Sequence, residues 1–308
     1  MKSIAPHRKV KDKKLNLSGI VPPLVTPFNE QGEIEYELFR KEVNKMVRMG
    51  VRGISVGGST GEGATLSDQE LVNLVKIAKE EVQNEVTLVC GIITDSTYQS
   101  VKRGLLVKDL GVDYLMITPI HYLDNSGQQG IFEYYKEIKE RVNLPIIVYN
   151  VVPWYTAAPE TLFHLRKEGF IDAVKQSGGD IHALGELLSM AKNDMPIMTA
   201  IDDMMYPSFI LGAVGSICAI NTLIPKTSVR LLDYVHKGDY DKALILHEKI
   251  LPIYKKILKE DMPSRIKFAM NNSGWDVGFA RMPILPLTDK EKAELKLISK
   301  KVVELENG

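Results

Sequence analysis

Lys175 lies inside an apolar stretch of the chain, residues 170–177, where an ammonium group is costly to bury. If this stretch is a strand that opens into a pocket, desolvation favours the neutral amine. A neutral amine attacks a ketone to form a Schiff base, which then acts as an electron sink while a neighbouring carbon–carbon bond breaks or forms. The alternative is a lysine at a strand end that extends its ammonium into solvent or pairs with a carboxylate. The segment alone is compatible with both interpretations.

Tyr149 places a phenol where another apolar run, residues 144–148, meets solvent. Condensation of an amine with a ketone needs proton transfers, and a positioned tyrosine hydroxyl can relay them. A tyrosine at a strand end is also common as a packing residue with one wet tip. Because Lys175 lies on the next predicted strand, the two side chains could converge, and their joint placement indicates a catalytic pair.

A glycine-rich turn, residues 57–62, follows the second predicted strand and carries adjacent hydroxyls on Ser59 and Thr60. Glycine, as at Gly58, permits unusual backbone angles and close approach of a ligand, while amides and hydroxyls donate to an anionic oxygen. We therefore expect the turn to bind a carboxylate. The ordinary alternative is a tight turn into the next helix. A phosphate-binding P-loop is a poor fit, because the turn lacks the lysine of that motif.

Two further strand ends carry polar residues. His121 and Tyr122 follow the fourth predicted strand, and Asp202 follows the seventh. A lone histidine is more often structural than catalytic, and the aspartate could bind a cation, bind substrate hydroxyls or cap the next helix. The six histidines of the chain form no H-E-x-x-H motif or comparable cluster, so we predict no metal site.

These residues can act together only if the fold brings them to one place, and the hydrophobic pattern of the chain predicts strands and helices that do so. Short β-rich runs alternate with longer amphipathic runs, which is typical of parallel βα units. The predicted strands are residues 19–25, 53–56, 87–91, 114–117, 145–149, 173–176, 196–200 and 215–219. Eight strands predict an α/β fold, a (β/α)8 TIM barrel, in which catalytic groups gather at the carboxyl ends of the strands. A doubly wound sheet is the rival, but no G-x-G-x-x-G follows the first strand.

Helices fill the intervals, and the clearest start is Ser67 with Glu70, which have the spacing of a capping box. From about Lys226 onward the pattern is helical only, with breaks near residues 238–239 and 262–263. We therefore predict three parts: a basic N-terminal arm at 1–17, a catalytic barrel at 18–235, and a C-terminal helical extension at 236–308 that packs on the barrel.

The composition of the 308 residues is that of a globular protein, with 44% hydrophobic and 25% charged residues. Lys plus Arg and Asp plus Glu number 39 each, so no general field attracts nucleic acid or an acidic membrane. Cys90 and Cys218 lie in separate apolar segments and are predicted to be core residues. No apolar stretch is long enough for a signal peptide or membrane span, so we expect a cytoplasmic location.

Taken together, the segments resemble the dihydrodipicolinate synthase and N-acetylneuraminate lyase superfamily of class I, Schiff-base aldolases. The resemblance covers roughly residues 18 to 300. It rests on Val25-Thr26-Pro27-Phe28, Gly58-Ser59-Thr60-Gly61-Glu62, Tyr149-Asn150, Val174-Lys175, the segment 212–217 that ends at Ile217, and Arg281-Met282-Pro283.

The resemblance implies a lysine imine between Lys175 and pyruvate or another 2-oxo acid, with Tyr149 moving the proton. It implies that Ser59 and Thr60, with Gly58 and Ile217, bind the 2-oxo acid. Members of the family are similar in being barrels with a helical C-terminal region that need no metal or organic cofactor. They are usually cytoplasmic homotetramers, so we expect a homo-oligomer, a tetramer or a dimer.

The sequence departs from the family pattern at two places. The arginine that in dihydrodipicolinate synthases receives the carboxylate of the aldehyde is absent, and Tyr155 stands at its approximate position. The paired tyrosines after the fourth strand are replaced as well, so either His121 or Tyr122 is the candidate for the relay contact from a neighbouring subunit. Trp154 and Tyr155 make the second-substrate side more aromatic, which suggests a sugar-derived or aromatic aldehyde.

The leading interpretation is therefore a class I lyase or aldolase that acts on a 2-oxo acid and an aldehyde. Within that chemistry the alternatives are 4-hydroxy-tetrahydrodipicolinate synthesis, a hydratase-aldolase, and dehydration of a keto-deoxy sugar acid. From other classes, the chain could be a non-catalytic barrel that binds a 2-oxo acid, because a fold does not fix function. A phosphate-binding isomerase is disfavoured, since barrel phosphate sites usually follow strands seven and eight.

Overall fold

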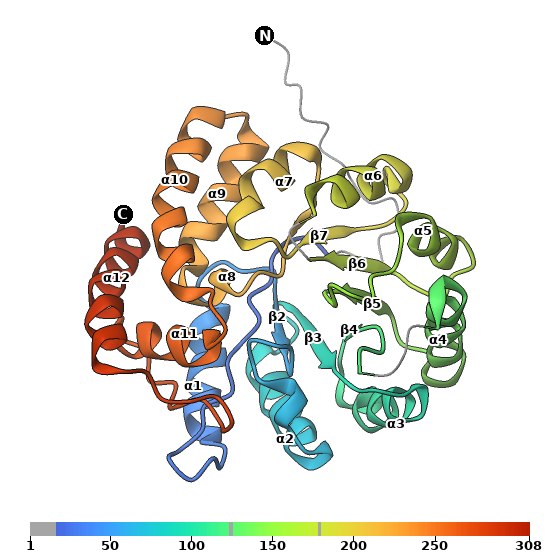
Figure 1. The fold of residues 1–308 in the computed structure, drawn as a ribbon, viewed down its shortest axis with the longest axis horizontal. Helices are drawn as coiled ribbons and strands as arrows, with labels where there is room; N and C mark the ends of the chain where they lie inside the picture. The colour runs from blue at the N-terminus through green and yellow to red at the C-terminus, as the bar shows by residue number, and fades with distance from the viewer. Residues whose placement is uncertain (1–16, 123–125, 178–179) are drawn as a thin grey trace.

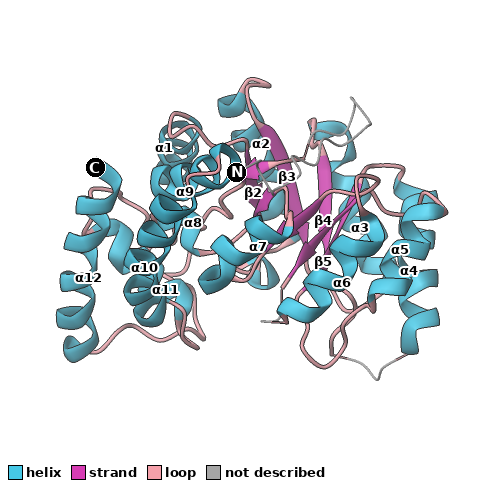
Figure 2. Ribbon diagram, turned by 90° about the horizontal axis from the view of Figure 1, so that it is seen from above, coloured by secondary structure: helices cyan, strands magenta, loops and turns pink. Residues whose placement is uncertain are grey.

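A computed structural model describes residues 17–122, 126–177 and 180–308, and the predicted basic arm at 1–17 lies almost wholly outside the described residues. Parallel strands occupy the centre of the molecule and helices surround them (Figures 1 and 2). The strands are β1 (Gly19–Ile20), β2 (Gly53–Val56), β3 (Thr87–Ile92), β4 (Tyr114–Ile117), β5 (Ile146–Asn150), β6 (Ala173–Gln176), β7 (Ile197–Thr199) and β8 (Gly215–Ser216).

The strands form one 8-stranded parallel sheet in the order β1-β8-β7-β6-β5-β4-β3-β2. The segment after β1 runs beside β2 and joins the two ends of the sheet: Ser55 N donates to Pro22 O over 3.0 Å, and Leu24 N donates to Ser55 O over 2.9 Å. Prolines 22 and 23 have no N–H to donate, which shortens β1 relative to the predicted strand 19–25. The predicted (β/α)8 barrel is confirmed.

Each of the first seven strands is followed by a helix that covers the outside of the barrel. The helices are α1 (Tyr36–Val47), α2 (Asp68–Val82), α3 (Thr97–Val107), α4 (Gly127–Val142), α5 (Pro159–Lys167), α6 (Ile181–Ala191) and α7 (Met205–Leu211). The predicted capping box is present at the start of α2, where Ser67 and Glu70 each accept the other's backbone N–H.

The C-terminal part consists of helices, which gather on one side of the barrel in Figure 1. They are α8 (Ile220–Leu223), α9 (Pro225–Lys237), α10 (Tyr240–Ile257), α11 (Met262–Asn271) and α12 (Asp289–Asn307). Helix α9 ends before Gly238, so the first predicted break lies between helices. The second predicted break is a few residues late: α10 ends at Ile257, and Met262 and Pro263 already form the start of α11, where a proline is tolerated. The division of the chain at residue 235 stays a prediction.

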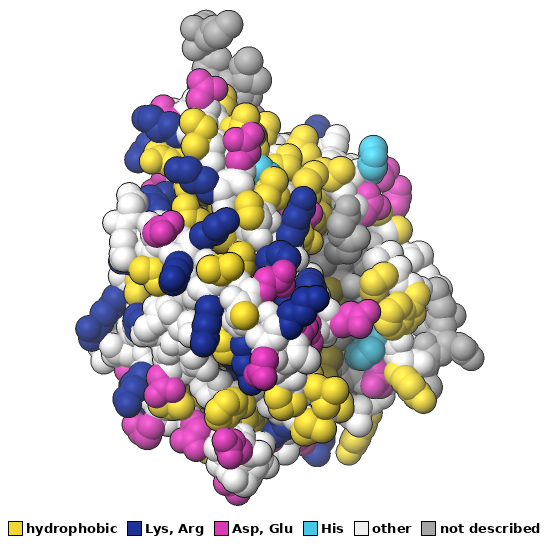
Figure 3. All heavy atoms as spheres, turned by 60° about the vertical axis from the view of Figure 1, so that its left-hand side comes forward, with side chains coloured by type: hydrophobic (Ala, Val, Ile, Leu, Met, Phe, Trp, Pro, Cys, Tyr) yellow, Lys and Arg dark blue, Asp and Glu magenta, His cyan; other side chains and the backbone are white. Residues whose placement is uncertain are grey.

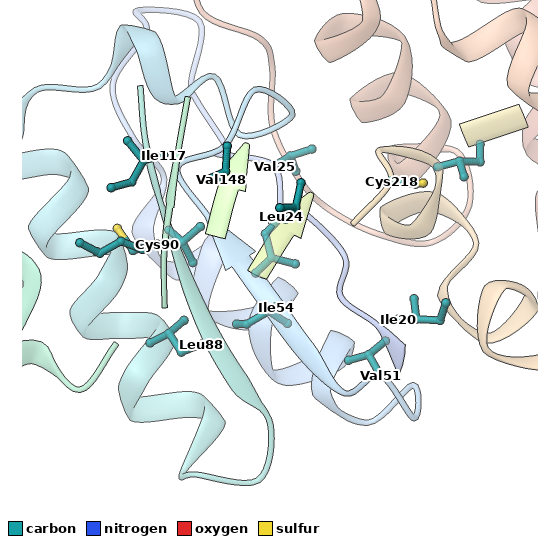
Figure 4. Close-up of a cluster of buried hydrophobic side chains, with 14 of the residues drawn as sticks. Ile20, Leu24, Val25, Val51, Ile54, Leu88, Cys90, Ile117, Val148 and Cys218 are labelled. Carbon is teal, nitrogen blue, oxygen red and sulfur yellow. The ribbon is translucent and has the colours of Figure 1, made fainter. Parts of the chain in front are cut away.

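Alternation along the strands divides the core into two layers. In β4, Tyr114 and Met116 point into the barrel, whereas Leu115 and Ile117 face the helices. The inner layer also contains Tyr149 and is completed by Leu17, Val21, Val89, Ile147, Ala173, Met198 and Ile217. Figure 4 shows part of the outer layer, with both cysteine sulfurs among apolar side chains.

Cys90 and Cys218 are both buried free thiols, which confirms their prediction as core residues. Burial raises the pKa of Cys90 to about 12, so this thiol does not ionise near neutral pH.

Charges of both signs are interspersed on the face shown in Figure 3, which agrees with the balanced composition. Within the described ranges, no helix is long and apolar enough to cross a membrane.

Candidate active site

Lys175 and Tyr149 are direct neighbours on β6 and β5. The parallel register pairs Tyr149 with Lys175 and Lys175 with Met198, and both of these neighbours belong to the layer inside the barrel. Lys175 therefore points into the barrel, with its Nζ 3.6 Å from the centre of the Tyr149 ring.

Lys175 is only 4% exposed, so its ammonium does not extend into solvent. In the described part of the chain it has no ion-pair partner within 4.0 Å. The geometry therefore supports neither a solvent-exposed ammonium nor an ion pair with a carboxylate. Lys175 Nζ is instead enclosed against an aromatic ring.

The glycine-rich turn lies directly beside this pair. The Tyr149 hydroxyl donates to Ser59 Oγ over 3.2 Å, which connects β5 with the turn after β2. Ser59 is exposed toward the opening, whereas Thr60 is buried. The predicted relay and the predicted carboxylate-binding hydroxyls therefore form one continuous site.

The backbone of the turn can only be built with small residues at its start. Gly57 has φ +72°, and a Cβ there would lie 2.7 Å from Leu71 Cδ1. The turn is then closed by backbone and side-chain bonds: Gly63 N donates to Gly58 O over 3.0 Å, and Thr26 Oγ1 donates to Gly61 O over 2.6 Å. Its end is fixed by Glu62, which has the left-handed φ of 56°.

Glu62 is part of the site's support, and sequence reasoning missed its partner Lys267. The two side chains are each 1% exposed, and Nζ lies 2.5 Å from Oε1. A signal was present, because Lys267 stands in the run Ile266-Lys267-Phe268-Ala269, another lysine among apolar residues. Nothing in the local sequence, however, connects it with a carboxylate 205 positions away.

Asp202 begins the 3-10 helix η3 (Asp202–Met204) after β7 and accepts a hydrogen bond from Ile220 N over 2.7 Å. Burial raises the pKa of Asp202 to about 6, and the Ile220 N–H and the charge of nearby Lys175 oppose this rise. Its carboxyl group thus lies near the amine and accepts from the first residue of α8, which follows β8. The cap that the sequence left open, on the helix directly after β7, is not made by Asp202, because η3 has no side-chain cap. Ile217, fully buried, belongs to the layer inside the barrel.

A cavity of about 380 Å³ opens beside the glycine-rich turn, at the carboxyl ends of the strands. Its walls include Ser59, His121 and Trp154, together with Pro263 and Ile284 from the C-terminal part. The residues that complete its lining are Glu62, Gly63, Ala64, Thr65, Ile93, Thr118, Val151, Val152 and Pro153.

His121 and Trp154 form one side of this cavity. Trp154 Nε1 donates to His121 O over 2.9 Å, and His121 Nδ1 lies 3.4 Å from Asp95 Oδ1. The indole itself is 70% exposed. An aromatic surface therefore lies at the mouth of the cavity, where a second substrate would enter.

Tyr122 and Tyr155 are placed differently from His121 and Trp154. Tyr122 is 83% exposed, and Tyr155 is buried with its hydroxyl 2.7 Å from Ser126 Oγ. Neither belongs to the described residues that line the cavity. The expected contact of either tyrosine with a second substrate remains a prediction.

A larger cavity, of about 650 Å³, lies between the loop after β1 and the C-terminal part, where Asn29, Phe268 and Met282 contribute to its walls. Its described lining contains none of the predicted catalytic residues. The described lining of the smaller cavity includes Ser59, His121 and Trp154 among the predicted site residues, but neither Lys175 nor Tyr149. Among the described residues, no group of three or more His, Cys, Asp or Glu side chains could hold a metal ion.

Comparisons with known proteins agree with this geometry. The model of the Dihydrodipicolinate synthetase family matches residues 16–302. A 4-hydroxy-tetrahydrodipicolinate synthase from Methanococcus maripaludis is 32% identical over 285 residues, covering 91% of this chain and 96% of that protein. A second, from Bacillus velezensis, is 28% identical over 288 residues, covering 92% of this chain and 99% of the relative.

Solved structures extend the likeness to two kinds of enzyme. Dihydrodipicolinate synthase from Thermotoga maritima superposes with a TM-score of 0.88 at 27% identity, covering 94% of this chain and 99% of that one. CdNal from Clostridium difficile, in complex with mannosamine, gives 0.87 at 25% identity, covering 94% and 100%. The predicted Schiff-base lyase or aldolase class is confirmed at this level, and the chain belongs to the dihydrodipicolinate synthetase family.

Proposed function

We propose that this chain is a class I lyase in which Lys175 forms an imine with pyruvate or another 2-oxo acid. The observation that carries the proposal is the enclosed Lys175 amine, 3.6 Å from the ring of a tyrosine whose hydroxyl reaches Ser59. No metal or organic cofactor is needed for this chemistry, because the imine itself accepts the electrons.

The reaction begins when the lone pair of Lys175 Nζ attacks the keto carbon of the acid. The carbinolamine that forms loses the former keto oxygen as water, and Tyr149 transfers the protons that this step requires. The protonated imine then accepts the electron pair released when a bond at the neighbouring carbon breaks, which gives an enamine. Protonation of the enamine and hydrolysis of the imine return the free lysine.

The glycine-rich turn and the layer of side chains inside the barrel bind the 2-oxo acid. The hydroxyls of Ser59 and Thr60 and the backbone at Gly58 are suited to a carboxylate, because all can donate to an anionic oxygen. Ile217 supplies an apolar surface inside the barrel.

The second substrate is proposed to be an aldehyde that binds against His121 and Trp154, with Asp202 available to its hydroxyl groups. The aromatic mouth of the cavity favours a sugar-derived or aromatic aldehyde. The curated relatives, which are named 4-hydroxy-tetrahydrodipicolinate synthase, favour lysine-biosynthetic condensation as the second candidate. A panel of aldehydes offered with pyruvate, with product analysis, separates the two.

Assembly and location follow from the family resemblance. We propose a homo-oligomer, a tetramer or dimer, in the cytoplasm, in which Tyr122 or His121 reaches the site of a neighbouring subunit. The 83% exposure of Tyr122 supports a role that a single subunit does not fill.

Borohydride reduction in the presence of pyruvate tests the imine. Intact mass and peptide mapping should place the added group on Lys175. The second buried lysine of the site, Lys267, serves as an internal control and should remain unmodified. Turnover without any trapped adduct, or an adduct at another lysine, would refute the proposed mechanism.

A further inference from the structure

The end of the glycine-rich turn is attached to the C-terminal part of the chain. Lys267, on α11, donates to Glu62 Oε1, to Thr26 O and to Phe279 O, over 2.5, 2.5 and 2.6 Å. The other carboxylate oxygen of Glu62 accepts the Arg281 N–H over 2.7 Å. All three ammonium protons and both carboxylate oxygens thus have partners.

The charges in this buried cluster balance. Burial raises the pKa of Glu42 to about 8, and Val25 N and the charge of Lys267 partly oppose the rise. At neutral pH the neutral form of Glu42 therefore predominates, so the ion pair of the cluster is that of Lys267 with Glu62. Burial lowers the pKa of Lys267, and the charge and hydrogen bond of Glu62 oppose this.

A buried ion pair is weak evidence for stability, because desolvation offsets much of the attraction. The pair instead contributes conformational specificity, because the hydrogen bonds made by both charged groups hold the surrounding backbone in one conformation. Here the arrangement includes the left-handed backbone of Glu62, three residues after Ser59, and Glu62 N donates to Ser59 O over 3.0 Å. The pair thus restrains the turn that carries Ser59 and Thr60, the two hydroxyls proposed to bind the substrate carboxylate.

We propose that Lys267 is a positioning residue for 2-oxo acid binding, acting through Glu62 on the turn that carries Ser59 and Thr60. The inference rests on the proposed function of that turn. It assigns the C-terminal helices a part in substrate affinity although they lie outside the ring of strands.

Replacing Lys267 by Met tests the proposal, because Met has a similar length but no charge and no donor. We expect KM for pyruvate to rise by about 10- to 100-fold, the loss expected for a charged hydrogen-bonded contact. The rate at saturating pyruvate should fall much less, and borohydride should still trap pyruvate on Lys175 at saturation.

The matched control is Lys139→Met. Lys139 pairs with Asp172 over 2.8 Å in a partly buried bridge at the opposite end of the barrel, before β6 begins. This variant should lose thermal stability without a change in KM. The double variant Glu62→Gln with Lys267→Met removes both charges, so it should recover folding stability while KM stays high.

The outcomes are separable. If the wild-type chain does not trap pyruvate, the proposed function fails before any variant is compared. If the wild type traps pyruvate and folded Lys267→Met has the wild-type KM, the positioning role is refuted. If the single variant does not fold, the double variant tests the positioning role instead. Wild-type KM together with recovered stability in the double variant would show that Lys267 has a purely structural role.

Discussion

The Nζ of Lys175 lies 3.6 Å from the centre of the Tyr149 ring, and the two residues are register partners on adjacent parallel strands. The ring encloses the amine, while the hydroxyl at its far end reaches Ser59 over 3.2 Å. In the proposed mechanism one side chain thus performs two tasks, shielding the Lys175 amine and connecting it with the turn that carries Ser59. The variants below separate these tasks.

Lys175→Arg should fold and yet fail to form a reducible adduct with pyruvate, because a guanidinium stays protonated and offers no free amine. Circular dichroism checks the fold, and mass spectrometry after borohydride checks the adduct. Normal turnover by this variant would rule out the imine.

Tyr149→Phe keeps the ring over the amine and removes only the hydroxyl. Turnover should fall by about 10²- to 10⁴-fold, the usual contribution of a positioned proton-transfer group. Tyr135→Phe is the control, because the buried Tyr135 hydroxyl donates to Ile117 O over 2.9 Å in the outer layer. Equal activity of the two variants would remove Tyr149 from the mechanism.

Trp154→Ala should weaken the use of the aldehyde and leave the imine intact. The indole is 70% exposed, so stability should change by less than about 0.5 kcal/mol, as at most surface positions. We expect kcat/KM for the aldehyde to fall by about tenfold or more, the loss of a packed aromatic contact. Steady-state kinetics at saturating pyruvate measure this, and an unchanged value would place the aldehyde elsewhere.

Asp202→Asn should change how stability depends on pH. Because burial raises the pKa of Asp202 from 3.8 to about 6, the folded state binds a proton more tightly than the unfolded state. This contribution is complete below about pH 4 and is lost as the pH rises through about 6. It amounts to at most about 3 kcal/mol.

The check is urea unfolding of the wild type and Asp202→Asn at pH 4 and pH 7. Glu42, whose pKa is also raised, titrates in both proteins, so the difference between them isolates Asp202. The stability of the wild type relative to the variant should decline as the pH rises. A constant difference would contradict the raised pKa.

Gly185→Ala should stabilise the protein. Gly185 lies inside α6, and an added Cβ would meet nothing within 4 Å. Replacing an interior helical glycine by alanine contributes about 0.5–1 kcal/mol. Thermal unfolding should show the gain at unchanged activity, and a loss of stability would mean that the site is more crowded than the structure shows.

The barrel was predictable because each βα unit repeats a local pattern. β2, β4 and β6 have the predicted bounds, and Ser67 with Glu70 forms the predicted capping box. The convergence of Lys175 and Tyr149 followed from the order of the strands, because parallel neighbours align their carboxyl ends.

Contacts between distant segments were not predictable. The Glu62–Lys267 bond spans 205 positions, and its existence depends on how α11 packs against the loops after β1 and β2. The direction of the Tyr155 side chain likewise depends on the start of α4, because its hydroxyl contacts Ser126, the residue before that helix. Neither partner follows from local periodicity.

The long span of the Glu62–Lys267 bond bears on how the protein is made. At about 5–20 residues per second, a ribosome reaches Lys267 roughly 10 to 40 s after Glu62. All eight strands, the last of which ends at Ser216, are translated before Lys267, so the turn that carries Ser59 gains its bond to Lys267 only after the whole sheet has been made. A nascent chain therefore already contains Lys175 and Tyr149 before α11 is made, and under the proposed positioning role its affinity for the keto acid should rise only once α11 has emerged.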